Sequence, residues 1–159
     1  MKTLIVFATK YGSAEICAEK IKSRLQSDAD ILNLKNNKNP NINEYDTVIV
    51  GGSIHAGRIQ GIVKKFCTAN EKTLLQKKIG IFVCCMYEGD KAQQQFNDAF
   101  SESLRVHASA QGILGGILDF DKMNFLEKTM VKKVAGVEES QFNISEENIT
   151  SFVQSLQKN

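Results

Sequence analysis

Residues 3–15 read T-L-I-V-F-A-T-K-Y-G-S-A-E, and this stretch decides what kind of fold the chain can form. Its first part, residues 3–8, is a short apolar run of the kind that forms a buried strand. The run stops at a cluster of hydroxyl side chains and one glycine, and apolar residues at helical spacing then extend from Ala14 to Leu25. The stretch therefore predicts a strand, a short polar loop and a helix in direct succession.

The rest of the chain repeats this alternation. Further strands are predicted at 29–34, 47–50, 78–85 and 109–118, and further helices at 60–70, 91–106 and 145–156. Most of the strand runs are apolar throughout, which is typical of parallel strands covered on both faces. Strands that alternate with helices in this way predict an α/β fold, with a parallel sheet between two helical layers.

Length and composition indicate one domain, residues 1–159, with 42% hydrophobic and 24% charged residues. No apolar segment approaches the ~20 residues of a membrane span, and the short run after Lys2 is too brief for a signal peptide. We therefore expect a cytoplasmic protein with no transmembrane segment. Nothing in the sequence leads us to expect a nucleic-acid partner.

The cysteines predict neither a metal site nor a cysteine-based reaction. Cys17, Cys67, Cys84 and Cys85 show no C-x-x-C spacing. Cys84 and Cys85 are neighbours in a strand-like run, so their side chains point to opposite faces and cannot converge on one metal. We interpret all four as small buried hydrophobic residues.

Ligands of an open parallel sheet bind outside the carboxyl ends of its strands, so the first polar loop is a candidate site. It consists of Thr9, Lys10, Tyr11, Gly12, Ser13 and Ala14. Hydroxyl groups, a flexible glycine and the free N–H groups of a helix start suit a phosphate. The loop lacks both G-x-x-x-x-G-K-[ST] and G-x-G-x-x-G. A simpler alternative is that Ser13 only caps the helix.

Two later loops suit a flat ring. Residues 51–58, G-G-S-I-H-A-G-R, are expected to form one long loop whose three glycines let the backbone approach a planar ligand. Residues 84–90, C-C-M-Y-E-G-D, offer an aromatic ring, a thioether and exposed amides. One phosphate loop and two loops suited to a ring predict a mononucleotide with a flat heterocycle.

The segment T-K-Y-G-S-A-E resembles the phosphate loop of flavodoxins, [ST]-x-T-G-x-T-E. The resemblance implies a three-layer fold with a five-stranded parallel sheet in the order 2-1-3-4-5, and FMN as the cofactor. It places Thr9, Lys10, Tyr11, Gly12, Ser13 and Ala14 around the phosphate, Ser53, Ile54, His55, Ala56 and Gly57 on one side of the isoalloxazine, and Cys84, Cys85, Met86 and Tyr87 on the other. Tyr11 and Ala14 depart from the pattern, because flavodoxins usually carry threonines there.

Residues 51–58 and the later stretch G-I-L-G-G-I-L-D-F-D-K-M-N-F-L-E-K, residues 112–128, are similar to menaquinone-dependent protoporphyrinogen dehydrogenases of the flavodoxin type. That family has an extra segment after its last strand, and residues 119–136 occupy this place. The resemblance implies a flavin-dependent oxidoreductase with a quinone or porphyrinogen-type substrate as its redox partner. In such an enzyme His55 would be the catalytic residue that assists proton movement. In an electron carrier His55 would only modulate the flavin potential, and Arg58 would stabilise an anionic reduced flavin.

Two other functions stay open. A flavodoxin-type electron carrier is the first, although such carriers are strongly acidic and this chain has 20 basic and 18 acidic residues, a net charge of +2. The second is a non-redox module that binds a phosphate ligand, since Tyr11 and Ala14 remove hydroxyl donors from the phosphate loop.

The extra segment also carries an apolar stripe. Met123, Leu126, Met130 and Val134 recur near helical spacing among several lysines. We favour the interpretation that this stripe packs on the sheet and leaves its lysines in solvent. The alternative is a peripheral contact of residues 122–134 with an anionic membrane surface.

Overall fold

The computed structural model describes residues 1–158 and shows a parallel sheet between two layers of helices. The strands of the sheet, in spatial order, are β2 (Asp28–Asn33), β1 (Lys2–Ala8), β3 (Thr47–His55), β5 (Lys78–Cys84) and β6 (Ala110–Ile113). All neighbouring pairs in this series are parallel. This is the order 2-1-3-4-5 that the resemblance implied, so the expected fold class is confirmed.

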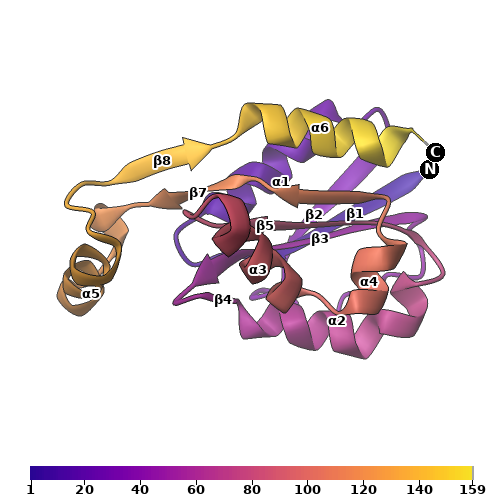
Figure 1. Cartoon of the computed structure of the whole chain (residues 1–159). Coiled ribbons are helices and arrows are strands. Elements are labelled where there is room, and N and C mark those ends of the chain that lie inside the picture. Colours follow the sequence, from indigo (N-terminus) through magenta and orange to yellow (C-terminus); the bar gives the residue numbers. More distant parts are fainter. Residues whose placement is uncertain (159) are drawn as a thin grey trace.

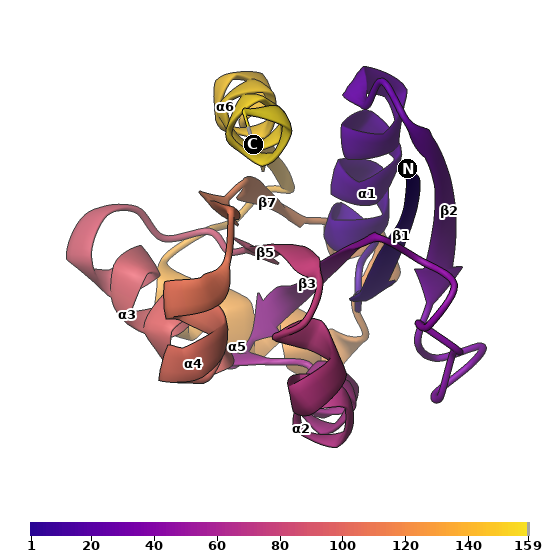
Figure 2. The same cartoon turned by 90° about the vertical axis from the view of Figure 1, so that its right-hand side faces the viewer.

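Helices cover both faces of the sheet (Figures 1 and 2). One layer holds α1 (Ser13–Arg24) and α6 (Glu146–Gln157), and the other holds α2 (Gly61–Leu74), α3 (Gly89–Ala99) and α4 (Glu102–His107). Successive residues of β1 serve the two layers in turn, because side chains alternate along a strand. Ile5 and Phe7 pack under α1 and α6, whereas Leu4 and Val6 pack under α2 and α3.

A close approach between β3 and β5 explains one glycine. A Cβ atom on Gly51 would lie 2.1 Å from the Phe82 ring, so only glycine leaves room for that ring beside β3. Phe82 in turn meets Phe152 of α6 edge-on, with 6.1 Å between ring centroids. The glycine is therefore needed for core packing at this position, and not for loop flexibility.

The prediction of one long loop at residues 51–58 was wrong. β3 continues to His55, because Gly51, Gly52 and Ser53 pair in register with β5. The chain then turns through Ala56 and Gly57, with φ values of 49° and 77°, and returns as β4 (Arg58–Ile59). A two-residue hairpin with both central residues at positive φ matches the twist of the strands, so the segment forms a tight hairpin.

The single helix predicted at 91–106 was also wrong, since it is split into α3 and α4. Phe100 is extended at the break (φ −126°, ψ 143°), and its side chain is buried against Phe96. Ser101 then starts the second helix, because its hydroxyl accepts a hydrogen bond from the Leu104 N–H. Burial of Phe100 and this cap together favour two helices over one.

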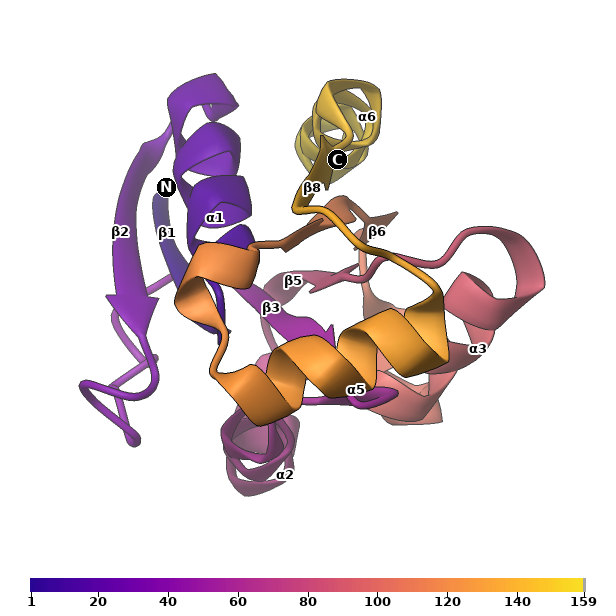
Figure 3. The same cartoon turned by 90° about the vertical axis from the view of Figure 1, so that its left-hand side faces the viewer.

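The last predicted strand, residues 109–118, divides at Gly115, whose φ is 80°. Only β6 belongs to the sheet; β7 (Gly115–Leu118) leaves it and pairs with β8 (Gln141–Ile144) in an antiparallel ribbon. Between them lie the 3-10 turn η1 (Phe120–Lys122) and helix α5 (Phe125–Ala135). Figure 3 shows α5 lying across the strand ends, from the α1 side toward the α3 side.

Our favoured prediction, that the apolar stripe of Met123, Leu126, Met130 and Val134 packs on the sheet, was wrong. No residue of α5 is buried, and Met130 and Val134 are 62% and 75% exposed. The helix is stabilised locally instead, by a capping box between Asn124 and Glu127 and by Gly136 at its end. Among residues 1–158, no helix is long and apolar enough to cross a membrane.

Candidate functional site

A cavity of about 450 Å³ lies at the carboxyl ends of β1, β3 and β5, and α5 covers its other side. Its volume is in the range of small-molecule sites. The predicted residues that line it are Lys10, Tyr11, Ser13, Ser53, Ile54, His55, Ala56, Gly57, Cys84, Met86 and Tyr87. Thr9, Gly12, Ala14 and Cys85 do not line it. The structure thus brings residues from all three predicted loops to one cavity.

The loop after β1 leaves a helix N-terminus open. Gly12 adopts a left-handed conformation (φ 96°) at the start of α1, and no side chain in residues 1–158 caps that end. The alternative that Ser13 caps the helix is therefore wrong, since Ser13 is the first residue inside it. The Gly12 N–H donates to the Thr9 hydroxyl over 3.0 Å, which fixes the turn. An uncapped helix start retains N–H donors and the positive end of the helix dipole for an anion.

Three lysines surround this loop. The ammonium groups of Lys35 and Lys122 donate to the backbone carbonyls of Thr9 and Tyr11, the second over 3.3 Å. Lys10 lies within the loop, and its Nζ is 2.6 Å from a carboxylate oxygen of Glu127 on α5. Positive charge therefore gathers at this loop. It can attract an anionic ligand in place of the threonine hydroxyls that the sequence lacks.

The two departures from the flavodoxin pattern have different consequences. Ala14 is fully buried among the core residues of α1, so it contributes packing rather than ligand contact. Tyr11 faces the cavity, with its ring edge-on to His55 at 6.0 Å. The Tyr11 hydroxyl is buried and has no hydrogen-bond partner within residues 1–158. Burial, followed by the nearby Glu127 carboxylate, raises the pKa of Tyr11, so the hydroxyl stays protonated and can donate.

His55 and Ser53 occupy the end of β3. The buried Ser53 hydroxyl lies 3.3 Å from the Lys10 N–H and accepts its hydrogen bond. Lys10 Nζ is 3.1 Å from Nε2 of His55. Burial, and then the Lys10 charge, lowers the pKa of His55, so its imidazole is neutral near pH 7 and its Nε2 can accept a hydrogen bond from the Lys10 ammonium.

The end of β5 supplies an aromatic side and a buried thiol pair. Lys91 Nζ lies over the Tyr87 ring, 3.5 Å from its centroid. Cys84 is buried with its Sγ 3.5 Å from Sγ of Cys17, and this contact and burial both raise the pKa of the Cys84 thiol. All four cysteines are buried and free, which confirms their interpretation as buried hydrophobic residues. Cys84 therefore contributes a protonated thiol to the lining of the cavity.

Comparison with known proteins is consistent with this geometry. The family described as "Flavodoxin domain" matches residues 4–145. The chain belongs to the flavodoxin-domain family. Quinone-dependent protoporphyrinogen IX dehydrogenase of Escherichia coli K12 is 23% identical over 143 residues, which cover 84% of this chain and 78% of that protein. The resemblance to flavodoxins is therefore confirmed, and the more specific resemblance has a distant relative in its support.

One solved structure supports the fold, and a second is similar to part of the chain. Oxidised flavodoxin 1 from Bacillus cereus superposes with a TM-score of 0.58 at 17% identity, covering 100% of this chain and 99% of that one. A flavoprotein from Lactobacillus acidophilus NCFM in complex with FMN has a TM-score of 0.48 at 17% identity, covering 72% of this chain and 91% of that one.

Several residues that line the cavity of this flavodoxin domain were missed from the sequence. They are Lys91 and Gln95 on α3, Gly116, Ile117 and Leu118 on β7, and Met123, Met130, Val131 and Val134 on or before α5. Met123, Met130 and Val134 had been noticed as a stripe but assigned to the sheet. Arg58, proposed near the flavin, instead lines a neighbouring hollow with Lys64 and Asp98.

Proposed function

We propose that this flavodoxin domain binds FMN noncovalently and acts as a flavin-dependent oxidoreductase, related in activity to quinone-dependent protoporphyrinogen dehydrogenase. The observation that carries the proposal is the second wall of the cavity. Met123, Met130 and Val131 face the strand ends across it, so the cavity is lined by apolar groups on two sides. A redox carrier needs an exposed flavin edge, whereas a covered apolar cavity suits a flavin that meets an apolar substrate.

The residues present fit FMN at both of its ends. The uncapped start of α1 and the lysines around it suit the phosphate. The buried Tyr11 hydroxyl makes no well-formed hydrogen bond within residues 1–158, although the Glu127 carboxylate lies near it, so it is a further donor for a ligand. The hairpin at Ala56 and Gly57 and the loop at Met86 and Tyr87 flank the space for the ring. FMN, when bound, supplies the exchange of hydride or single electrons.

His55 gives the site a proton acceptor. Removal of hydride from a substrate carbon leaves a proton to be taken up, and the neutral imidazole of His55 lines the cavity. Lys10 Nζ lies 3.1 Å from Nε2 of His55 and 2.6 Å from a carboxylate oxygen of Glu127, so Lys10 must leave Nε2 before this nitrogen can take up a proton. We assign His55 the role of proton acceptor and Lys10 the role of holding its ring in the neutral form.

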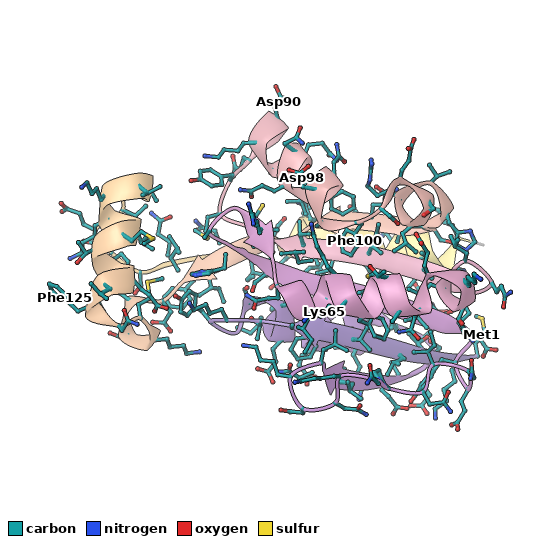
Figure 4. The ribbon with its side chains drawn as sticks, turned by 90° about the horizontal axis from the view of Figure 1, so that it is seen from below. Met1, Lys65, Asp90, Asp98, Phe100 and Phe125 are labelled. Carbon is teal, nitrogen blue, oxygen red and sulfur yellow. The ribbon has the colours of Figure 1, made fainter. Side chains whose placement is uncertain are left out.

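The outer surface of α5 suits contact with a membrane, in which an apolar electron acceptor would be dissolved. Phe125 and Leu126 are 80% and 75% exposed, and the same helix carries Lys128, Lys132 and Lys133. Figure 4 shows Phe125 at the end of the molecule opposite Met1. We propose a cytoplasmic protein that touches an anionic membrane through residues 122–134, where a quinone is dissolved.

The first test is the visible spectrum of the purified protein, before and after FMN is added and the excess removed. The holo form is then offered protoporphyrinogen and a menaquinone analogue without oxygen, and porphyrin fluorescence is followed. Retained flavin with turnover supports the oxidoreductase. Retained flavin without turnover favours the electron carrier, and no retained flavin favours the non-redox module.

The membrane contact has its own test. Sedimentation with anionic vesicles of phosphatidylglycerol and phosphatidylcholine should carry down the wild type, and Leu126→Glu should reduce the bound fraction several-fold. Val106→Glu is the matched control, because Val106 is 82% exposed on α4 and away from α5. Equal binding of both variants would contradict the contact through α5.

A further inference from the structure

Gln95 is a buried polar side chain that the fold does not explain. It lies on the inward face of α3 with Ala92, Phe96 and Ala99, and only 7% of it is exposed. Its Oε1 atom is buried and has no hydrogen-bond partner within residues 1–158. A glutamine is rarely buried, and a buried carbonyl without a donor is a clear penalty to the folded state. Such an atom calls for a partner that the protein itself does not provide.

The position of Gln95 suggests what this partner is. Gln95 lines the cavity beside Met86 and Tyr87, and it also borders the hollow under Gly57 and Ile59 of the hairpin. The phosphate loop follows β1, and β3 lies between β1 and β5, from which the chain leads into α3. Gln95 is therefore at the opposite end of the cavity from the phosphate loop. Figure 4 labels Asp90 and Asp98, which bracket Gln95 on α3.

We propose that Gln95 recognises the imide edge of the flavin ring, an inference that rests on the proposed binding of FMN. The pyrimidine part of the isoalloxazine carries one N–H group between two carbonyl groups. Oε1 of Gln95 accepts the hydrogen bond from this N–H, and the side-chain NH₂ group can donate to a flanking carbonyl. With the phosphate at the start of α1, a mononucleotide that extends across β3 presents its ring toward α3. Gln95 thereby fixes the orientation of the ring and selects heterocycles that have an N–H donor there.

The competing explanation is an ordered water that satisfies Oε1 with or without a ligand. The two explanations differ in what a flavin analogue does. If Gln95 contacts the imide, methylation of that nitrogen removes the donor and adds bulk where Oε1 lies. If a water satisfies Oε1, the wild type should not distinguish FMN from 3-methyl-FMN through this residue.

The experiment titrates the apoprotein with FMN and with 3-methyl-FMN and follows the quenching of flavin fluorescence. The wild type should bind FMN at least tenfold more tightly than the analogue. Gln95→Met keeps the size of the side chain but removes the acceptor, so FMN affinity should fall about tenfold and the preference for FMN should disappear. The same change removes an unsatisfied buried carbonyl, so the apoprotein should melt at the same or a higher temperature.

Gln94→Met is the matched control. Gln94 is the same residue type one position away on α3, but it is exposed and its amide donates to Asp98 over 2.9 Å. The Gln94→Met variant should keep both the affinity for FMN and the preference for FMN over 3-methyl-FMN. The wild-type comparison of the two ligands needs no variant, so it tests the inference even if Gln95→Met is poorly folded.

Each outcome distinguishes the inference from the function on which it rests. If the wild type binds FMN but binds 3-methyl-FMN equally well, or if Gln95→Met keeps the preference, Gln95 does not read the imide edge and FMN binding stands. If the wild type binds no FMN, the proposed function is wrong and the inference fails with it.

Discussion

The two walls of the cavity are built in different ways. The wall at the strand ends consists of residues fixed by the sheet and the core, such as Ser13, Ser53 and Cys84, which are 4%, 7% and 1% exposed. The α5 wall belongs to a helix with no buried residue. Two polar contacts connect this side of the cavity to the first wall. They are the ion pair between Lys10 and Glu127, and the hydrogen bond from Lys122, just before α5, to the Tyr11 carbonyl.

This contrast assigns the walls different tasks. A wall held by strand pairing and dense packing keeps its geometry, which suits the binding of a cofactor. A wall held by a few partly exposed polar contacts opens at small energetic cost, which suits the entry of a substrate. Substitutions in the two walls should therefore differ in their effects, which follow from the largest to the smallest.

Gly12→Asp should give the largest effect, a loss of FMN affinity of about a hundredfold, because a carboxylate would face the phosphate at close range. Isothermal titration of the apoprotein with FMN measures it. Gly12→Ala is the control, since it introduces the same strain at φ 96° without the charge. Equal affinities for the two variants would remove the phosphate from this loop.

His55→Ala should slow flavin reduction or reoxidation about tenfold or more, with a smaller change in FMN affinity. Stopped-flow absorbance of the holo form follows the rates. His107→Ala is the control, because His107 lies on α4 and its Nε2 contacts the Lys77 carbonyl, 2.8 Å away. A loss of affinity as large as the loss of rate would show that His55 only positions the flavin.

Acid should loosen the α5 wall. Lys10, followed by the Asn124 backbone, lowers the pKa of Glu127, so the ion pair is complete above the usual carboxyl pKa and is lost as the pH falls through the lowered value. The pKa of His55 is also lowered, so His55 gains its proton only below the usual imidazole range, and the imidazolium then repels Lys10.

Amide hydrogen exchange should therefore speed up in residues 125–135 as the pH is lowered from 7 to well below the usual carboxyl pKa, corrected for the intrinsic pH dependence, while α1 stays protected. Glu127→Gln should produce the faster exchange already at pH 7, and the exposed Glu139→Gln should not. If the rate of amide hydrogen exchange in α5 changes neither with pH nor in Glu127→Gln, the ion pair does not hold the helix.

Ala56→Gly should have the smallest effect, a gain in stability of about 1 kcal/mol, because alanine is strained at positive φ and glycine is not. Thermal unfolding of the apoprotein measures it. Ala69→Gly in the exposed part of α2 should lower stability by a similar amount. A loss of stability at both positions would contradict the left-handed turn at the tip of the β3–β4 hairpin.

The sheet and the wall at the strand ends could be predicted from the sequence because both depend on local signals. Buried parallel strands appear as apolar runs, and the loops that follow them carry glycine, hydroxyl and aromatic residues that a covered strand does not need. Gly51 shows the limit of such signals. It was interpreted as loop glycine, whereas the structure uses it to admit the Phe82 ring between strands.

The α5 wall was not predictable in the same way. The stripe with Met130 and Val134 is visible in the sequence, but a stripe does not say which surface it faces. Gln95 did carry a signal, because it shares helical spacing with Ala92 and Ala99 and thus had to face inward. No local pattern connects that face with the cavity, since β5 and α3 become neighbours of the β3–β4 hairpin only on folding.

By itself, the sequence determined the alternation of strands and helices, the parallel sheet and the polar loop after β1 that we propose binds a phosphate, because each depends on residues close together in the chain. The tertiary structure alone decided that β3 runs on to a hairpin, that β7 leaves the sheet, and that α5 closes the cavity over His55 and Lys10. These features depend on contacts such as Lys10–Glu127, which join residues more than a hundred positions apart. Contacts of that kind are specified by packing and charge in three dimensions, and no local pattern encodes them.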